Sequence, residues 1–264
     1  MTAPAAQTSA PLAGGFLYDF RILGGRTLRL LLVSKNIVST LLRPVIFFLA
    51  FSLVLHGILV ANGVDFGQFF PPAIIAQTTG FAAMGTAFEL ATDNGNGLLS
   101  RCRSLPIHSG AVVCARLVAD GAQAFGYLVV AVAAGFVVGF RFERGVGWAV
   151  VFVLVAVLFA VALGLAVAPI GIRSTRPQEI GPMMFMVLIP LVNFSSAFVP
   201  VTAFPEWLRP VVQLSPFTSE VEALRALSTE GASLTPVWHA AAWIAGLTLV
   251  FGWLSARTWR RAVR

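Results

Sequence analysis

The sequence predicts an all-α integral membrane protein with six transmembrane helices, an N-terminal amphipathic interfacial helix and a re-entrant helix pair between the fifth and sixth spans. Of its 264 residues, 58% are hydrophobic and only 11% are charged, whereas soluble domains carry about 25% charged residues. The apolar residues also gather in stretches of roughly 20, the length that one membrane-crossing helix needs. No water-soluble fold could bury so much apolar surface, and one helical membrane domain is expected.

The region before the first span divides into two parts. Residues 1–15 carry no charge and consist mainly of Ala, Pro, Ser, Thr and Gly, so they are predicted to form a disordered tail. Residues 16–33 place Phe16, Phe20 and Leu23 on one helical face and arginines on the other. That pattern is typical of a helix lying on the membrane surface, with an amphipathic helix packed on protein as the alternative. A single transmembrane domain is therefore expected over 16–264.

Six apolar stretches account for the spans, at about residues 37–61, 69–91, 112–138, 146–172, 180–199 and 237–256. In the second span, Pro71 and Pro72 are expected in the first helical turn, where a missing N–H costs little. Pro182 and Pro190 predict a kink in the fifth span. The breaker cluster at 93–97 is expected to end the second span and to open a long loop.

The segment 204–228 is too polar for an ordinary span. Pro205, Pro210 and Pro216 interrupt it, and its five charged side chains could not all remain in hydrocarbon. Two short amphipathic helices that dip into the outer leaflet without crossing it are expected here.

The distribution of charge predicts the orientation. With the N-terminus inside, fourteen of the 18 basic residues but only five of the 11 acidic residues fall on the cytoplasmic side. Basic residues near the ends of spans are retained in the cytoplasm. Both termini are therefore expected in the cytoplasm of a plasma or inner membrane, and the net charge of +7 does not require a nucleic-acid partner.

Several kinds of enzymatic site are absent from the sequence. A nucleotide-binding P-loop needs a lysine within its Gly-rich motif, but Lys35 is the only lysine and Asn36 follows it. Neither G-x-S-x-G nor H-E-x-x-H occurs. Cys102 and Cys114 fall in or beside a cytoplasmic loop, where thiols stay reduced, and the three histidines are scattered. No catalytic, cofactor or metal site is expected in this chain.

A few side chains at membrane depth are candidates for a transport path, since charge there is costly and often functional. Glu89 lies near the cytoplasmic end of the second span and has either a structural or a transport role. Arg116 and Asp120 are four residues apart on the third span, so an intrahelical ion pair is the simpler interpretation. Phe47, Phe51 and Phe81 either line a lipophilic cavity or pack against lipid and neighbouring helices. No row of carboxylates crosses the membrane, which argues against proton coupling.

Three local features carry a resemblance to a known family. They are the stretch 91–120, the outer turn Gly139-Phe140-Arg141-Phe142 with Gly145, and Phe204-Pro205-Glu206-Trp207-Leu208-Arg209-Pro210 followed by Leu214-Ser215-Pro216 and Ala223-Leu224-Arg225. The chain resembles the permease subunit of ABC-2-type exporters, in the daunorubicin-resistance branch of drug and lipid exporters. The resemblance implies the ABC-2 exporter fold and outward movement of a hydrophobic or amphiphilic compound.

The resemblance also implies partners. An ABC ATPase dimer would bind ATP-Mg in place of this chain, and a second permease, the same chain or a related one, would complete the assembly with membrane lipids around it. Such a chain can receive energy only through a surface that it shares with the ATPase. The segment 98–107 is the longest cytoplasmic connection, and it offers the apolar anchors and charges that a docked segment uses. The predicted ATPase-coupling residues are Leu98, Leu99, Arg101, Arg103 and Leu105.

Two other function classes remain open from the sequence. A secondary transporter or channel for a small solute would show inverted repeats or mid-membrane charges. A membrane enzyme acting on lipids would need clustered Asp, His or Cys at one interface, and Asp93, Cys102 and His108 have no recognised spacing. The sequence does not identify the transported compound, because a hydrophobic cavity recognises the shape of its ligand through many weak contacts.

Overall fold

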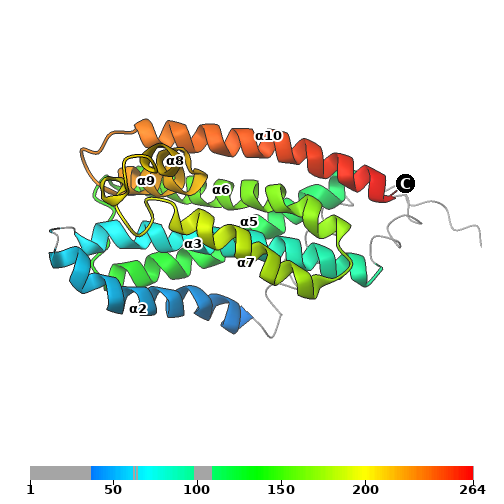
Figure 1. The fold of residues 1–264 in the computed structure, drawn as a ribbon, viewed down its shortest axis with the longest axis horizontal. Helices are drawn as coiled ribbons and strands as arrows, with labels where there is room; N and C mark the ends of the chain where they lie inside the picture. The colour runs from blue at the N-terminus through cyan, green and yellow to red at the C-terminus, as the bar shows by residue number, and fades with distance from the viewer. Residues whose placement is uncertain (1–36, 62, 64, 98–108, 264) are drawn as a thin grey trace, which may run out of the picture.

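The computed structural model describes residues 37–61, 63, 65–97 and 109–263, and its regular elements there are all helical. Six long helices lie side by side (Figure 1). They are α2 (Ile37–Ala61), α3 (Phe66–Gly95), α5 (Ser109–Val137), α6 (Val146–Arg173), α7 (Pro177–Asn193) and α10 (Thr235–Val263). Between α7 and α10 come the 3-10 helix η1 (Val201–Ala203) and the short helices α8 (Arg209–Leu214) and α9 (Pro216–Ser228). The predicted tail, interfacial helix and coupling segment lie outside the described residues.

The long helices alternate in direction along the chain (Figure 1). The turn between α5 and α6 lies at one end of the bundle together with the segment 194–234, which includes α8 and α9. We call this the loop end. The end of α3, the turn between α6 and α7 and the end of α10 lie at the opposite end.

Three segments in the described part of the chain are long and apolar enough to cross a membrane. They are Leu117–Val137 in α5, Val146–Arg173 in α6 and Thr235–Thr258 in α10. A shorter apolar stretch, Phe48–Ala61, lies in α2. Helix α3 has a different environment, because α2, α5, α6, α7 and α9 all pack around it. A helix enclosed by protein can carry hydroxyl groups, and Thr78, Thr79 and Thr86 of α3 are buried.

Helix α3, which corresponds to the second predicted span, is longer than predicted at both ends. It begins at Phe66 because the Asp65 side chain caps it, accepting from the backbone N–H of Gly67 at 2.9 Å. Pro71 and Pro72 therefore lie in its second turn rather than its first, and the prediction that they open the helix is wrong. Helix α3 also continues through 93–95, where a loop was expected, because Asn94 bonds to the end of α6 at the opposite end of the bundle.

The fifth predicted span ends early. Helix α7 stops at Asn193, six residues before the predicted end. Beyond it, Ser196 donates its backbone N–H to Thr218 Oγ1 at 3.0 Å, and the carbonyls of Ser196 and Ala197 accept from Arg225. These partners on α9 replace the helical hydrogen bonds, so the backbone leaves the helix here. The predicted pair of short helices after this point is present as α8 and α9.

Among the described helices, α3 and α6 share the most extensive contact. Small residues allow the two backbones to approach, as in other membrane helix pairs. A Cβ added at Gly171 of α6 would lie only 2.5 Å from the carbonyl oxygen of Ala87 on α3. A bulkier residue at this position would force the two helices apart, so the glycine fixes their separation.

Candidate functional site

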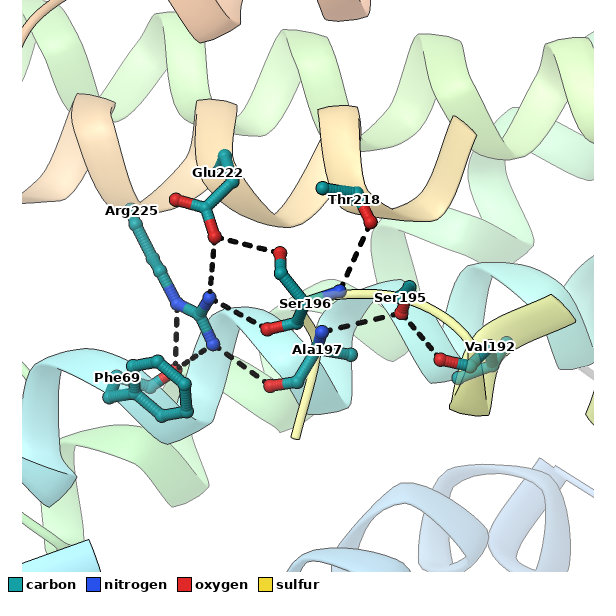
Figure 2. A network of polar contacts seen from close by, with 8 residues as sticks. All are labelled: Phe69, Val192, Ser195, Ser196, Ala197, Thr218, Glu222 and Arg225. Carbon is teal, nitrogen blue, oxygen red and sulfur yellow. Dashed lines mark hydrogen bonds and ion pairs between the residues drawn. The ribbon is translucent and has the colours of Figure 1, made fainter. Parts of the chain in front are cut away.

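An arginine on α9 ties three parts of the loop end together. All five N–H groups of the Arg225 guanidinium donate hydrogen bonds (Figure 2). Two go to the carbonyl oxygen of Phe69 on α3, at 3.1 and 3.0 Å. The others go to the carbonyls of Ser196 and Ala197 and to the carboxylate of Glu222, at 2.8–2.9 Å. The guanidinium also lies 3.6 Å from the centre of the Phe69 ring, a cation–π contact.

The neighbours of Arg225 hold its partners in place. Glu222 Oε1, which accepts from Arg225, also accepts from the hydroxyl of Ser196 at 2.7 Å. The Thr218 hydroxyl accepts from the backbone N–H of Ser196 (Figure 2). The Ser195 hydroxyl donates to the carbonyl of Val192 and accepts from the backbone of Ala197. We call these groups, centred on Arg225 and Glu222, the Arg225 network.

The network satisfies backbone groups that no helix satisfies. The segment after α7 is irregular, and unpaired carbonyls away from water are costly. Arg225 supplies a rigid set of donors that matches several oxygens at once. Burial lowers the pKa of Arg225 to about 10, against the raising effect of Glu222, so the guanidinium remains charged at neutral pH. The arrangement can hold α9, α3 and the α7–η1 connection together.

A second buried acid lies on the same helix and faces α3. Glu220 is completely buried, and its Oε2 lies 3.1 Å from the hydroxyl oxygen of Thr79. Its other oxygen has no hydrogen-bond partner among the described residues. Burial raises the pKa of Glu220 well above its ordinary value.

The turn between α5 and α6 fastens the connection between α9 and α10. Arg144 donates to the carbonyl of Thr229 at 2.8 Å and to that of Ala232. Glu143 accepts from the backbone N–H of Glu230 at 3.1 Å and from the side-chain amide of Gln68 at 3.1 Å. The outer turn noted in the sequence therefore anchors the segment that follows the short helices.

The structure distributes the predicted transport-path residues over several contacts. Glu89 is partly buried on α3. Asp120 is buried beside the contact of α3 and α6, where a Cβ added at Gly164 would meet its Oδ2 at 3.4 Å. The Arg116 side chain lies outside the described part, so its ion pair with Asp120 stays a prediction. Among the described residues, no group of His, Cys, Asp or Glu side chains could hold a metal ion.

The predicted phenylalanines belong to two different groups of neighbours. Phe51 of α2 stacks on Phe198 with ring centroids 4.9 Å apart. Phe81 of α3 contacts Phe185 of α7 at 5.9 Å. The Phe47 side chain is not among those described. The five coupling residues, Leu98, Leu99, Arg101, Arg103 and Leu105, also lie outside the described residues, and their role stays a prediction.

Comparison with known proteins decides the family. A model of the ABC-2 type transporter family matches residues 18–228. The chain belongs to this family. It is 27% identical over 225 residues to the daunorubicin resistance ABC transporter permease protein DrrB1 of Streptomyces coeruleorubidus, covering 85% of this chain and 80% of that protein.

Two mycobacterial proteins are similar to this ABC-2 chain. The probable doxorubicin resistance permease DrrC of Mycobacterium tuberculosis is 25% identical over 230 residues, 86% of this chain and 82% of its own length. The doxorubicin resistance permease DrrB of the same organism is 27% identical over 205 residues, 75% and 71% of the two lengths. The predicted resemblance is thereby confirmed: the chain is a multi-pass membrane protein and the permease subunit of an ABC exporter.

Sequence reasoning did not assign individual roles to Glu220, Glu222 and Arg225 at the loop end. Glu222 and Arg225 are three apart, a spacing that signals a helical ion pair, and the structure contains that pair at 2.9 Å. No local signal shows that Arg225 reaches Phe69, which is 156 positions away in the sequence. Likewise, nothing near Glu220 in the sequence identifies Thr79 as its partner.

Proposed function

We propose that this permease exports a hydrophobic or amphiphilic compound, a drug or a lipid, out of the cytoplasm or inner leaflet. The observation that carries the proposal is its similarity to permeases named for daunorubicin and doxorubicin resistance, over three quarters or more of the chain. The energy comes from a separate ABC ATPase dimer that binds ATP-Mg. A second permease, either the same chain or a related one, completes the translocation unit.

We further propose that all six long helices cross the plasma or inner membrane, with both termini in the cytoplasm and the loop end outside. The alternating directions of the helices support this arrangement, as does the excess of arginine at the opposite end. Residues 16–264 then form one transmembrane domain behind a disordered tail over 1–15, with an interfacial helix at 16–33.

In the same proposal, α8 and α9 are a re-entrant pair in the outer leaflet. Irregular backbone at membrane depth is tolerated only where protein or water satisfies its polar groups. The Arg225 network supplies that satisfaction for the segment between α7 and α8. The exposed Trp207, Val211 and Leu214 beside it suit a position against lipid, since tryptophan favours the membrane interface.

The energy of ATP hydrolysis enters, in this proposal, through Leu98, Leu99, Arg101, Arg103 and Leu105. This stretch follows α3 directly, and Asn94 near the end of α3 donates to the carbonyls of Ile172 and Ser174 at 3.0 and 2.9 Å. Movement of a docked ATPase would therefore act on α3 and on the turn between α6 and α7 together. Leu99→Asp with Leu105→Asp should abolish co-purification with the ATPase while the protein remains inserted; retained co-purification would exclude this surface.

An efflux assay tests the function. Cells that produce this permease with its ATPase are loaded with daunorubicin, and the rate of fluorescence loss is measured against cells in which the ATPase lacks its P-loop lysine. ATP-dependent efflux is expected. Efflux that persists with the inactive ATPase would instead support a secondary transporter or channel. If daunorubicin is not moved in either strain, a fluorescent phospholipid tests the lipid alternative in the same way.

Cysteine labelling tests the orientation independently. An introduced cysteine at Glu230, at the loop end, should react with a membrane-impermeant reagent in intact cells, and one at Arg261 should react only after lysis. The reverse pattern would contradict the proposed topology and would leave the family assignment unaffected.

A further inference from the structure

The Thr79 hydroxyl has one hydrogen to donate and two acceptors within hydrogen-bond distance. The Thr79 hydroxyl lies 2.7 Å from the carbonyl oxygen of Ala76, one turn back on α3, and 3.1 Å from Glu220 Oε2. A threonine hydroxyl has one hydrogen. When it donates to the nearer carbonyl, the contact with Glu220 is a hydrogen bond only if the carboxyl supplies the proton and Thr79 accepts it.

Among the residues that the structure describes, no charged group near Glu220 is placed to stabilise a carboxylate. Helix α9 packs against α3, α6, α8 and α10. On α9 itself, Arg225 gives all five N–H groups to other acceptors, and Glu222 is engaged with Arg225 and Ser196. On α8, Arg209 donates to the carbonyls of Phe204 and Thr202.

The charged side chains that the structure describes on the other packed helices are also directed elsewhere. On α3, Glu89 and Asp93 are ten and fourteen residues beyond Thr79, about 15 and 21 Å along the helix axis. Arg173 ends α6 at the opposite end of the bundle. On α10, His239 is exposed and Arg257 lies over the ring of Trp253.

We infer that Glu220 is a proton-binding site, occupied while α9 packs on α3 and emptied when the two helices separate at the loop end. An ionised carboxylate in this position would be buried without a cation or enough donors, which is strongly unfavourable. A carboxylic acid there donates its O–H to Thr79. When water reaches the site, the carboxyl O–H bond breaks, the electron pair remains on the carboxylate, and the proton passes to water.

Proton binding by Glu220 makes the packing of α9 on α3 depend on pH in a defined direction. The packed state holds the proton at pH values where a solvated glutamate has lost it, so protons stabilise packing. This stabilisation is complete below the ordinary pKa of glutamate and declines as the pH rises towards the raised pKa of the packed state. Between these two values the packing equilibrium changes by up to about tenfold per pH unit. Under the proposed topology, on which this consequence rests, the relevant pH is that outside the cell.

Infrared spectroscopy of the full chain in lipid nanodiscs tests the inference without requiring transport. A protonated carboxyl has a C=O stretching band that a carboxylate lacks. At neutral pH the wild type should show this band, and Glu220→Gln should lose it. Glu222→Gln is the matched control on the same helix, because it removes an acid that pairs with Arg225 rather than with Thr79, and it should leave the band unchanged. Persistence of the whole band in Glu220→Gln would overturn the assignment.

A second variant keeps the test decisive if Glu220→Gln does not fold. Thr79→Val preserves the shape of the side chain and removes the hydroxyl that accepts the hydrogen bond from the protonated Glu220 carboxyl. The band should remain but move to higher frequency, as expected for a carboxyl that has lost a partner. A band that does not move in Thr79→Val, or no protonated band in the wild type at neutral pH, refutes proton binding by Glu220 even if daunorubicin efflux is normal.

Discussion

The contact between α3 and α6 predicts how much stability the protein loses when one methyl group is added at Gly171. In Gly171→Ala the added Cβ would lie 2.5 Å from the carbonyl oxygen of Ala87 and 2.8 Å from Leu90 Cβ. Ordinary contacts of a Cβ begin at 3.4 Å, so the helices would have to separate by up to roughly 0.9 Å. The closest obstacle is backbone, which no side-chain rotation relieves.

The magnitude follows from two opposing effects. Overpacking of this severity costs about 3 kcal/mol, and replacing a helical glycine with alanine returns about 1 kcal/mol. A net loss of about 2 kcal/mol should lower the unfolding midpoint by about 4–8 °C for a chain of this size. The measurement is thermal unfolding in lipid nanodiscs, followed by tryptophan fluorescence.

Two other glycines calibrate the result. Gly246 lies within α10 with nothing within 4 Å of an added Cβ, so Gly246→Ala should be neutral or stabilising by up to about 1 kcal/mol. Gly164 is intermediate, because its added Cβ would meet the Thr86 hydroxyl at 3.3 Å. The expected order of stability is Gly246→Ala, then Gly164→Ala, then Gly171→Ala. A Gly171→Ala protein as stable as the Gly246→Ala protein would refute the packing argument.

Further predictions concern the polar contacts at the two ends. Arg225→Lys keeps the charge but has three donors in place of five, so it should destabilise the protein by about 2–4 kcal/mol. Arg209→Lys, at a more exposed site, should destabilise it by less than about 1 kcal/mol. Equal thermal unfolding midpoints for the two variants would contradict a stabilising role of the Arg225 network. Asn94→Asp replaces a donor by an acceptor that faces two carbonyl oxygens, and should lower the free energy of unfolding by about 2 kcal/mol. It should also speed hydrogen exchange at the start of α7. Unchanged stability and exchange would show that the Asn94 contact does not hold the two helix ends together. Arg144→Ala should speed exchange in the connection from α9 to α10 while exchange in α6 stays as in the wild type, and unaltered exchange in that connection would show that the turn does not anchor it.

The extent to which the sequence predicted the helices differs from one to another. The end of α2 and the start of α6 match the prediction, because the apolar stretches meet helix-breaking sequences at these points. The two ends of α3 and the end of α7 do not match. In each case the deciding interaction is a side-chain hydrogen bond, from Asp65, Asn94 or Arg225, and two of these three join elements far apart in the sequence.

The candidate site was predictable only in part for the same reason. Residues such as Glu89 and Asp120 were selected because charge in a long apolar stretch is unusual. Glu220 and Arg225 lie in a segment of mixed polarity, where the charges predicted short helices but not which of the charged side chains become buried. Their burial arises when α9 packs against α3 and the segment after α7, and these contacts do not follow from local sequence.

The sequence by itself determined that the chain is a helical membrane protein that resembles ABC-2 permeases and has no P-loop motif. Hydrophobicity, helix-breaking residues and sequence motifs are local properties, and each is visible within a window of about 20 residues. Only the tertiary structure decided which glycine sets the separation of α3 and α6, and which acid becomes buried. Those outcomes depend on close packing and on desolvation, and both are determined by which atoms surround a group rather than by its neighbours along the chain.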